Sequence, residues 1–244
     1  MRMLTLARRN LKELLRDPLT LFFGAVFPLA LLGLLTLIQR NIPVQLFAIA
    51  SLAPGISVFG QSFLTLFSAL LISKDRTSAL TQRLMASPLT GPDFLLAYAL
   101  PLLPLALLQG LLCLLCAAPL GLNLAHLPLT LAVLLVSSLM YIAMGLLFGS
   151  ILNDKQVGGI CGALLTNLSA WLSGIWFDVK LVGGAFYRIA NALPFLHAVE
   201  AARAAAVGNT AALPGHLGIV VAYAVALMVL AVFAFTRTMR GGKA

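Results

Sequence analysis

Six stretches of the chain are each apolar over at least 20 residues and contain no Lys, Arg, Asp or Glu. A helix needs about 20 such residues to cross the roughly 30 Å hydrocarbon core of a bilayer. The six stretches are residues 19–38, 46–72, 94–118, 128–152, 157–177 and 216–235. This pattern predicts an all-α polytopic membrane protein with six transmembrane helices, in which residues 1–244 form a single transmembrane domain.

The composition excludes the other broad classes of protein. Hydrophobic residues make up 61% of the chain and charged residues 9%, whereas soluble domains have about 45–50% apolar and about 25% charged residues. Disordered chains need high charge and low hydrophobicity. A disulfide-stabilised secreted domain is excluded too, because the chain has only three cysteines and all lie in apolar runs.

The distribution of positive charge predicts the orientation. With the amino terminus inside, twelve of the sixteen Lys and Arg residues lie in inner segments, and the outer segments hold Arg40, Lys180, Arg188 and Arg203. Because cytoplasmic loops retain Lys and Arg, we expect a multi-pass protein of the inner (cytoplasmic) membrane with both termini in the cytoplasm. We expect no nucleic-acid partner, because the cations are spread over several short segments rather than gathered on one surface.

Residues 1–18 precede the first predicted span and have an amphipathic pattern. Apolar residues recur there at helical spacing, while most cations occupy other faces; the apolar residues are Leu4, Ala7, Leu11 and Leu14. Such a helix is typical of the membrane interface, and Pro18 predicts a break before the span. A basic anchor without further structure is the alternative interpretation.

The second connection, residues 73–93, is the longest inner one and predicts a short amphipathic helix. Asp75 or Thr77 is placed to cap it, leucines share one face, arginines lie elsewhere, and a proline ends it. The residues that we expect to dock a soluble partner are Arg76, Leu80, Arg83, Leu84, Ser87 and Pro88. A solvated linker helix explains the same pattern.

The fifth connection is external and is neither apolar enough to span nor polar enough to be a free loop. Its pattern predicts a pair of short re-entrant helices between spans 5 and 6, with a break at Pro194. Glu200 and Arg203 are three residues apart and are expected to pair. The residues singled out in this segment are Pro194, His197, Glu200 and Arg203.

The chemistry carried by the chain is limited. No Gly-x-x-x-x-Gly-Lys-[Ser/Thr] stretch occurs, since no lysine is followed by Ser or Thr, so we expect no ATPase site of that kind. His197 and Glu200 lack a third metal ligand, so no metal site is predicted. We interpret Cys113 and Cys116 as packing residues, with metal or redox use as the less favoured alternative.

The polar residues inside the spans are uncharged, which argues against an ion-coupled carrier, since such carriers place charge at membrane depth. Polar residues of this kind usually join helices to one another. Where aromatic side chains accompany them, they also suggest a substrate path, for which the candidates are Phe23, Phe27, Phe59, Phe63, Asn167 and Trp171.

In its layout the whole chain resembles the membrane subunit of ABC-2 type ATP-binding-cassette exporters. The similar parts are residues 11–18, the segment from Lys74 to Pro88, and residues 191–203. Leu80, Leu84, Ser87 and Pro88 match the inner pattern of that family, and Pro194, Val199, Glu200 and Arg203 match the outer one. The acidic residues and the glycine of the inner pattern are absent; Lys74, Arg76, Ser78 and Thr81 stand at or near their places.

The resemblance implies a permease that is not itself an enzyme. It would pair with a second copy of itself or a related permease, and with two copies of a cassette ATPase that binds ATP and Mg²⁺. Residues 76–88 would be the coupling helix, and the first, second and fifth spans would line a path for an amphipathic drug, lipid, or lipid-linked or peptide metabolite. An ion-coupled secondary transporter and an intramembrane enzyme are the alternatives; the spans carry neither intramembrane charge nor an acid–base or metal constellation.

Overall fold

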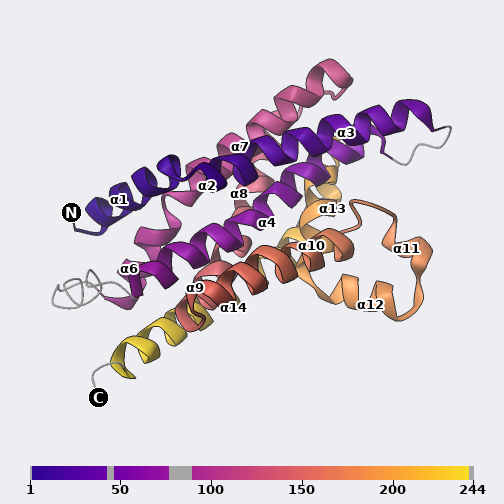
Figure 1. The fold of residues 1–244 in the computed structure, drawn as a ribbon. Coiled ribbons are helices and arrows are strands. Elements are labelled where there is room, and N and C mark those ends of the chain that lie inside the picture. Colours follow the sequence, from indigo (N-terminus) through magenta and orange to yellow (C-terminus); the bar gives the residue numbers. More distant parts are fainter. Residues whose placement is uncertain (1, 43–46, 77–89, 242–244) are drawn as a thin grey trace.

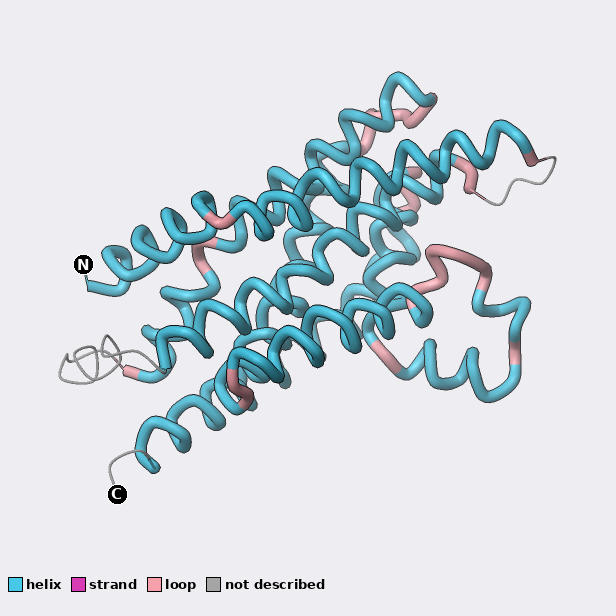
Figure 2. The backbone as a smooth tube through the Cα atoms, viewed as in Figure 1, coloured by secondary structure: helices cyan, strands magenta, loops and turns pink. Residues whose placement is uncertain are grey.

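The computed structural model describes residues 2–42, 47–76 and 90–241 of the chain (Figure 1). Helices joined by short turns make up this part, and no strand occurs within it (Figure 2). The prediction of an all-α protein is therefore confirmed.

Five helical segments among the described residues have the length and composition to cross a membrane. They are Pro18–Asn41, Ile49–Arg76, Gly91–Leu120, Leu127–Ile151 and Thr210–Thr238. The first comprises α2 (Pro18–Leu21), the π-helical η1 (Phe22–Val26) and α3 (Phe27–Asn41). The others comprise α4 (Ile49–Arg76); α6 (Gly91–Ala99), α7 (Leu102–Ala117) and η2 (Ala118–Leu120); α8 (Leu127–Ile151); and η4 (Thr210–Ala212) with α14 (Leu213–Gly241).

The predicted fifth span, residues 157–177, is helical but is not one of these five segments. It consists of α9 (Asp154–Val157), the π-helical η3 (Gly158–Leu165) and α10 (Thr166–Leu172). Its first turn is polar. Asn153 caps α9, because its Oδ1 accepts a hydrogen bond from the Gln156 amide (3.0 Å). The chain leaves the helix after Leu172. The apolar helical part is therefore shorter than the sequence predicts.

Helix α4 is the centre of the molecule, with 89% of its most apolar window buried, against 22% for the first span and 11% for the last. It packs closely against α8 at Gly145 and Gly149. A Cβ atom at Gly145 would overlap the Thr65 carbonyl and the Ser68 hydroxyl, and one at Gly149 would overlap the backbone of Ala69. Small residues thus permit the backbones of two spans to approach one another.

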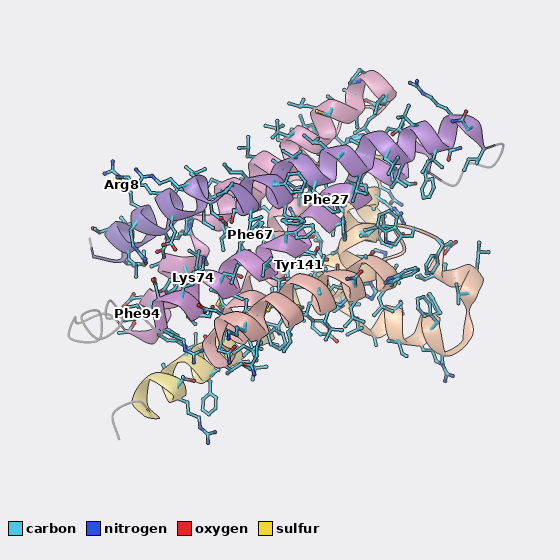
Figure 3. All side chains as sticks on the ribbon, viewed as in Figure 1. Arg8, Phe27, Phe67, Lys74, Phe94 and Tyr141 are labelled. Atoms are coloured by element: carbon cyan, nitrogen blue, oxygen red, sulfur yellow. The ribbon has the colours of Figure 1, made fainter. Side chains whose placement is uncertain are left out.

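Polar side chains join the same two helices. Thr65 Oγ1 donates to the Tyr141 carbonyl (3.1 Å), and Gln61 Nε2 donates to the Leu134 carbonyl (3.0 Å). Tyr141, in the middle of the bundle (Figure 3), also bonds Ser169 of α10 through its hydroxyl (2.7 Å). These uncharged groups act as interhelical links, as the sequence pattern suggests.

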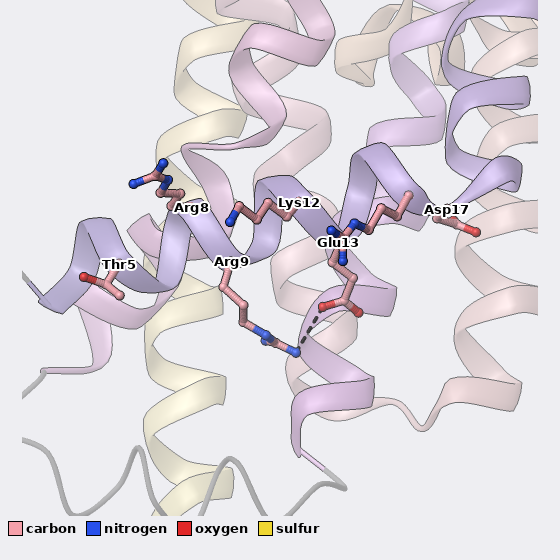
Figure 4. A pocket seen from close by; sticks show the side chains of 7 residues that line it. Thr5, Arg8, Arg9, Lys12, Glu13 and Asp17 are labelled. Carbon is pink, nitrogen blue, oxygen red and sulfur yellow. Dashed lines mark ion pairs between the residues drawn. The ribbon is translucent and has the colours of Figure 1, made fainter.

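The N-terminal helix α1 (Arg2–Arg16) is separate from the first span. It ends just before Asp17, whose carboxylate caps α2 by accepting from the Thr20 amide (3.1 Å). In the close view of Figure 4, α1 runs across the picture while α14 behind it runs up and down. Of the residues on its predicted apolar face, Ala7 and Leu14 are buried in the protein and Leu4 is exposed; Leu6 is buried as well.

Three short helices follow α10 at the other end of the bundle: α11 (Val179–Val182), α12 (Gly184–Ala192) and α13 (Pro194–Ala206). Helices α11 and α12 project to one side (Figure 1). Helix α13 packs among α4, α8 and α14, and its apolar residues are buried. The predicted pair of helices, with its break at Leu193–Pro194, corresponds to α12 and α13.

Candidate functional site

A polar cluster joins α1, α4 and α6 at one end of the bundle. Arg9 of α1 donates two hydrogen bonds to the Asp75 carboxylate of α4, from Nη1 to Oδ2 (2.5 Å) and from Nη2 to Oδ1 (2.9 Å). The Tyr98 hydroxyl of α6 donates to Asp75 Oδ2 (2.9 Å). Asn10, fully buried, donates from Nδ2 to the Ala97 carbonyl (3.2 Å). We call these four residues, Arg9, Asn10, Asp75 and Tyr98, the polar clamp.

The charges of the clamp stabilise one another. Asp75 is buried, and Arg9 also pairs with Glu13 one turn along α1 (3.0 Å), as the dashed line in Figure 4 marks. The hydrogen bonds that Arg9 donates to Asp75 raise the pKa of the Arg9 guanidinium above its usual value. A bidentate arginine–carboxylate pair fixes the angle between its partners as well as their distance. The clamp therefore fixes α1 relative to the end of α4.

The clamp flanks the segment that the sequence predicts to dock a partner. Helix α4 ends at Arg76, one residue after Asp75, and α6 begins at Gly91, about two turns before Tyr98. The predicted docking residues Leu80, Arg83, Leu84, Ser87 and Pro88 lie outside the described residues. Both described ends of this segment are thus fastened to α1.

Asp75 does not occupy the place that the sequence predicted, and Arg76, whose docking role stays a prediction, is the last residue of α4. Asp75 does not cap a new helix, because α4 continues through it and its carboxylate belongs to the clamp. Arg76 Nη1 donates to the carbonyls of Gly149 (2.8 Å) and Leu152 (3.3 Å). A cation suits the carbonyl end of a helix, so Arg76 anchors α4 to the end of α8.

Four of the predicted path residues form one aromatic cluster between the first span and α4. Phe23 and Phe63 stack with ring centroids 5.1 Å apart, and Phe27 lies 5.6 Å from Phe63 and 6.4 Å from Phe59. Phe27 is labelled in Figure 3 where the first span passes α4. Trp176 extends the cluster, with its ring 5.8 Å from Phe59. We call Phe23, Phe27, Phe59, Phe63 and Trp176 the aromatic cluster.

The other two predicted path residues lie elsewhere. Asn167 is exposed, and its side-chain amide donates to the Ala163 carbonyl of its own helix (2.8 Å). Trp171 is exposed too and contacts Phe177 (6.0 Å between centroids). Both residues lie on the exposed face of α10, away from the phenylalanines, and their place on a substrate path stays a prediction.

Both helices predicted to border α4 on the path contain π-helical turns. Segment η1 contains Phe23 and packs on α4. Segment η3, which lies between α9 and α10, packs on α4 as well. A π-helical turn leaves the regular hydrogen-bond ladder, and such turns recur at functional sites. The sequence gives no signal for them beyond Gly24 in η1 and the glycines of η3.

At the opposite end, Arg203 of α13 joins three elements. Its Nε donates to the Ser51 carbonyl (3.2 Å), its Nη2 to the Gly174 carbonyl (3.0 Å), and its Nη1 to Glu200 Oε1 (2.9 Å). The predicted Glu200–Arg203 pair is therefore present. These residues border an open cavity of about 540 Å³, and the polar partners of Arg203 stabilise its charge there.

His197 has a fixed place beside this cavity. Its Nε2 donates to the Asn191 carbonyl (2.8 Å), and its Nδ1 lies within hydrogen-bond distance of Nδ1 of His216 (2.9 Å). Pro194 begins α13, so the residues predicted for this segment lie on one helix. Within the described ranges, no three His, Cys, Asp or Glu side chains gather as metal ligands.

The sequence prediction missed the clamp residues Arg9, Asn10 and Tyr98. One signal was available, since Asp75 is the lone carboxylate between Lys74 and Arg76 at the end of an apolar run. A carboxylate in that place needs a partner. The spacing of 66 residues to Arg9 gave no means of naming that partner.

Comparison with known proteins gives the family. The sequence model of the ABC-2 type transporter family matches residues 1–207, a range that includes the polar clamp, the aromatic cluster and α13. No curated protein sequence matches the chain. Members of this family are membrane components that work with an ATPase partner and are not themselves catalytic. The chain therefore belongs to the ABC-2 type transporter family and is a multi-pass permease subunit of an ATP-binding-cassette transporter.

Proposed function

We propose that the chain is one half of the permease of an ATP-driven exporter that moves an amphipathic substrate across the inner membrane. It would have six spans, with residues 157–177 as the fifth and both termini in the cytoplasm. The excess of cations in the inner segments supports this orientation. The absence of charge in the apolar runs supports an energy source outside the chain.

The polar clamp is the observation that carries the proposal. A soluble ATPase must act on a membrane helix through a segment that it grips, and residues 76–88 are the expected coupling helix. The clamp fastens the helices on both sides of that segment to α1, which leads directly into the first span. A displacement of the coupling helix would therefore reach the first span through Asp75 and Arg9.

The aromatic cluster supports the proposed path. It joins the first span to α4, and the first span is mostly unburied in one chain, which leaves its outer surface for a second copy of this or a related permease. Two permeases would bind two ATPase subunits, and ATP with Mg²⁺ would be bound by those subunits. To drive transport, the closed ATPase pair must bind one arrangement of the permease more tightly than the other.

The test is a pair of leucine variants in the complex. The permease is purified from its native membrane with the ATPase that accompanies it and is reconstituted in vesicles. Leu84→Asp should reduce retention of the ATPase and ATP-driven transport at least tenfold, because a charge replaces the apolar side chain expected to enter the ATPase. Leu181→Asp, at an exposed position in α11, should leave both unchanged.

Two outcomes would contradict the proposal. One is full complex formation and transport by Leu84→Asp. The other is transport driven by an ion gradient in vesicles that hold the permease with neither ATPase nor nucleotide.

A further inference from the structure

Helix α1 has an exposed apolar face beside the one that packs on the protein. Leu6, Ala7 and Leu14 are buried. One step around the helix, Leu4 is 61% exposed and Leu15 is 52% exposed. Eleven residues are about three full turns of an α-helix, so these two leucines lie on nearly the same side of α1. They form a row that no described part of the chain covers.

The next face around the helix is basic. Arg8, Lys12 and Arg16 are exposed and follow one another at intervals of four residues, so they form a second row beside the leucines. They line an open cavity of about 810 Å³ together with Arg9, Glu13 and Asp17 (Figure 4). We call Arg8, Lys12 and Arg16 the basic row.

The positive charge of the basic row is uncompensated by the described residues. None of its three cations forms an ion pair with the part of the chain that the structure describes. The two carboxylates of the cavity are engaged elsewhere, Glu13 with Arg9 (3.0 Å) and Asp17 with the Thr20 hydroxyl (2.6 Å). The cavity therefore presents donors and positive charge to an anionic ligand.

The leucine row indicates which kind of anion the basic row binds. It continues into the start of the first span, where Leu19 is 65% exposed and Phe22 is also exposed. The exposed apolar surface of a span faces acyl chains, and α1 runs across α14 at this level (Figure 4). A helix with leucines beside cations fits the boundary between headgroups and acyl chains. A soluble acidic protein would account for the cations but would leave the leucines exposed to water.

We propose that the basic row binds the phosphate groups of anionic phospholipids, while Leu4 and Leu15 enter the acyl layer beside Leu19. Arg8 and Arg16 offer forked donors to phosphate, and Lys12 between them offers a point charge. The binding requires only that the chain lies in a membrane. A consequence for coupling rests on the proposed function: a lipid that holds α1 also holds Arg9 against Asp75.

The test uses the full-length permease without ATPase or nucleotide, so that its outcome is independent of the proposed function. Phosphatidylglycerol and phosphatidylcholine with identical acyl chains are offered together to the delipidated protein, and native mass spectrometry counts the molecules bound. One cation near an anionic surface contributes about fivefold in affinity at low ionic strength. The triple variant Arg8→Gln, Lys12→Gln, Arg16→Gln should therefore lower the preference for phosphatidylglycerol at least fivefold.

The matched control replaces three other exposed cations, as Arg40→Gln, Lys180→Gln and Arg188→Gln, and should keep the preference. A rise in NaCl from low to high concentration should weaken the preference of the unaltered protein, which tests the proposal even if the triple variant fails to fold. Dimyristoylphosphatidylglycerol should bind, whereas soluble glycerol 3-phosphate should not compete with it.

Three results would overturn the proposal. The first is an unchanged preference in the triple variant, or an equal loss in the control. The second is competition by glycerol 3-phosphate at the same concentration as the lipid, which would make the row a site for free anions. The third is an intact lipid preference in the triple variant together with loss of the ATPase when the same variant is purified as the complex, which would make the basic row a protein-docking surface.

Discussion

At the scale of the residue, Asp75 is notable as a buried carboxylate that needs partners to be stable. Its side chain is 6% exposed, and it accepts bonds from Arg9 and Tyr98 on two other helices. A buried carboxylate is stable only when paired and hydrogen-bonded. Its position one residue before the end of α4 makes it the contact through which α1 is joined to the expected coupling helix.

Asp75→Asn should therefore separate coupling from folding. The amide keeps the size of the side chain but loses the charge that Arg9 pairs with, and Arg9, 41% exposed and still beside Glu13, remains solvated. We expect a loss of about 1–2 kcal/mol in the free energy of unfolding, which leaves the protein folded, and a roughly tenfold loss of ATP-driven transport. Thermal unfolding in detergent and transport in vesicles measure the two effects.

Asp154→Asn is the control for Asp75→Asn, because Asp154 is exposed in the first turn of α9 and should tolerate the change. Normal transport by Asp75→Asn would remove the clamp from the mechanism. A double variant with Arg9→Gln should cost less than the two single losses combined, since both remove the same interaction.

Ion pairs show how far residue-level prediction reaches. Glu200 and Arg203 are three residues apart on one helix, so the sequence predicted their pair, which is present at 2.9 Å. Asp75 and Arg9 meet only after α1 folds back on the ends of α4 and α6, and no local spacing encodes that. Local contacts are therefore predictable from one sequence, and contacts set by the fold are not.

At the scale of the element, the contact of α4 with α8 depends on glycine. Gly145→Ala should separate the two helices, because the added Cβ would meet the Thr65 backbone as well as the Ser68 side chain. Overpacking of this kind costs about 1–3 kcal/mol. Thermal unfolding of the purified permease should show the loss as a lower midpoint.

Gly218→Ala in α14 is the matched control, since a Cβ there meets nothing within 4 Å. Alanine is the better helix former, so its unfolding midpoint should stay the same or rise. Equal midpoints for the two variants would mean that the α4–α8 approach is looser than the described contact.

Element ends were predictable where an apolar run ends in a turn. The fourth predicted span, residues 128–152, differs by one residue at each end from α8, which begins at Leu127 directly after His126. Helix α4 runs four residues past its predicted end because Asp75 and Arg76 find partners on other helices. Apolarity alone does not end a helix when its charged residues are paired.

At the scale of the whole molecule, the least buried spans indicate where partners lie. The first and last spans are mostly unburied in one chain. The proposed path, however, uses the first span and not the last. The first span carries the π-helical η1 and the aromatic cluster, whereas α14 packs on α8 and α13. We therefore expect the second permease to cover the first span and lipid to cover α14.

Cysteine cross-linking in native membranes distinguishes these two surfaces. Val26 is 53% exposed on η1 and Val229 is 63% exposed on α14, so they match in residue type and exposure. In a Cys116→Ser background, which removes the one exposed native cysteine, Val26→Cys should form a disulfide between two permeases on oxidation. Val229→Cys should remain monomeric on the same gel. The reverse pattern would place the partner on α14 and would leave the outer face of the first span to lipid, so that the first span could not line a path between two copies.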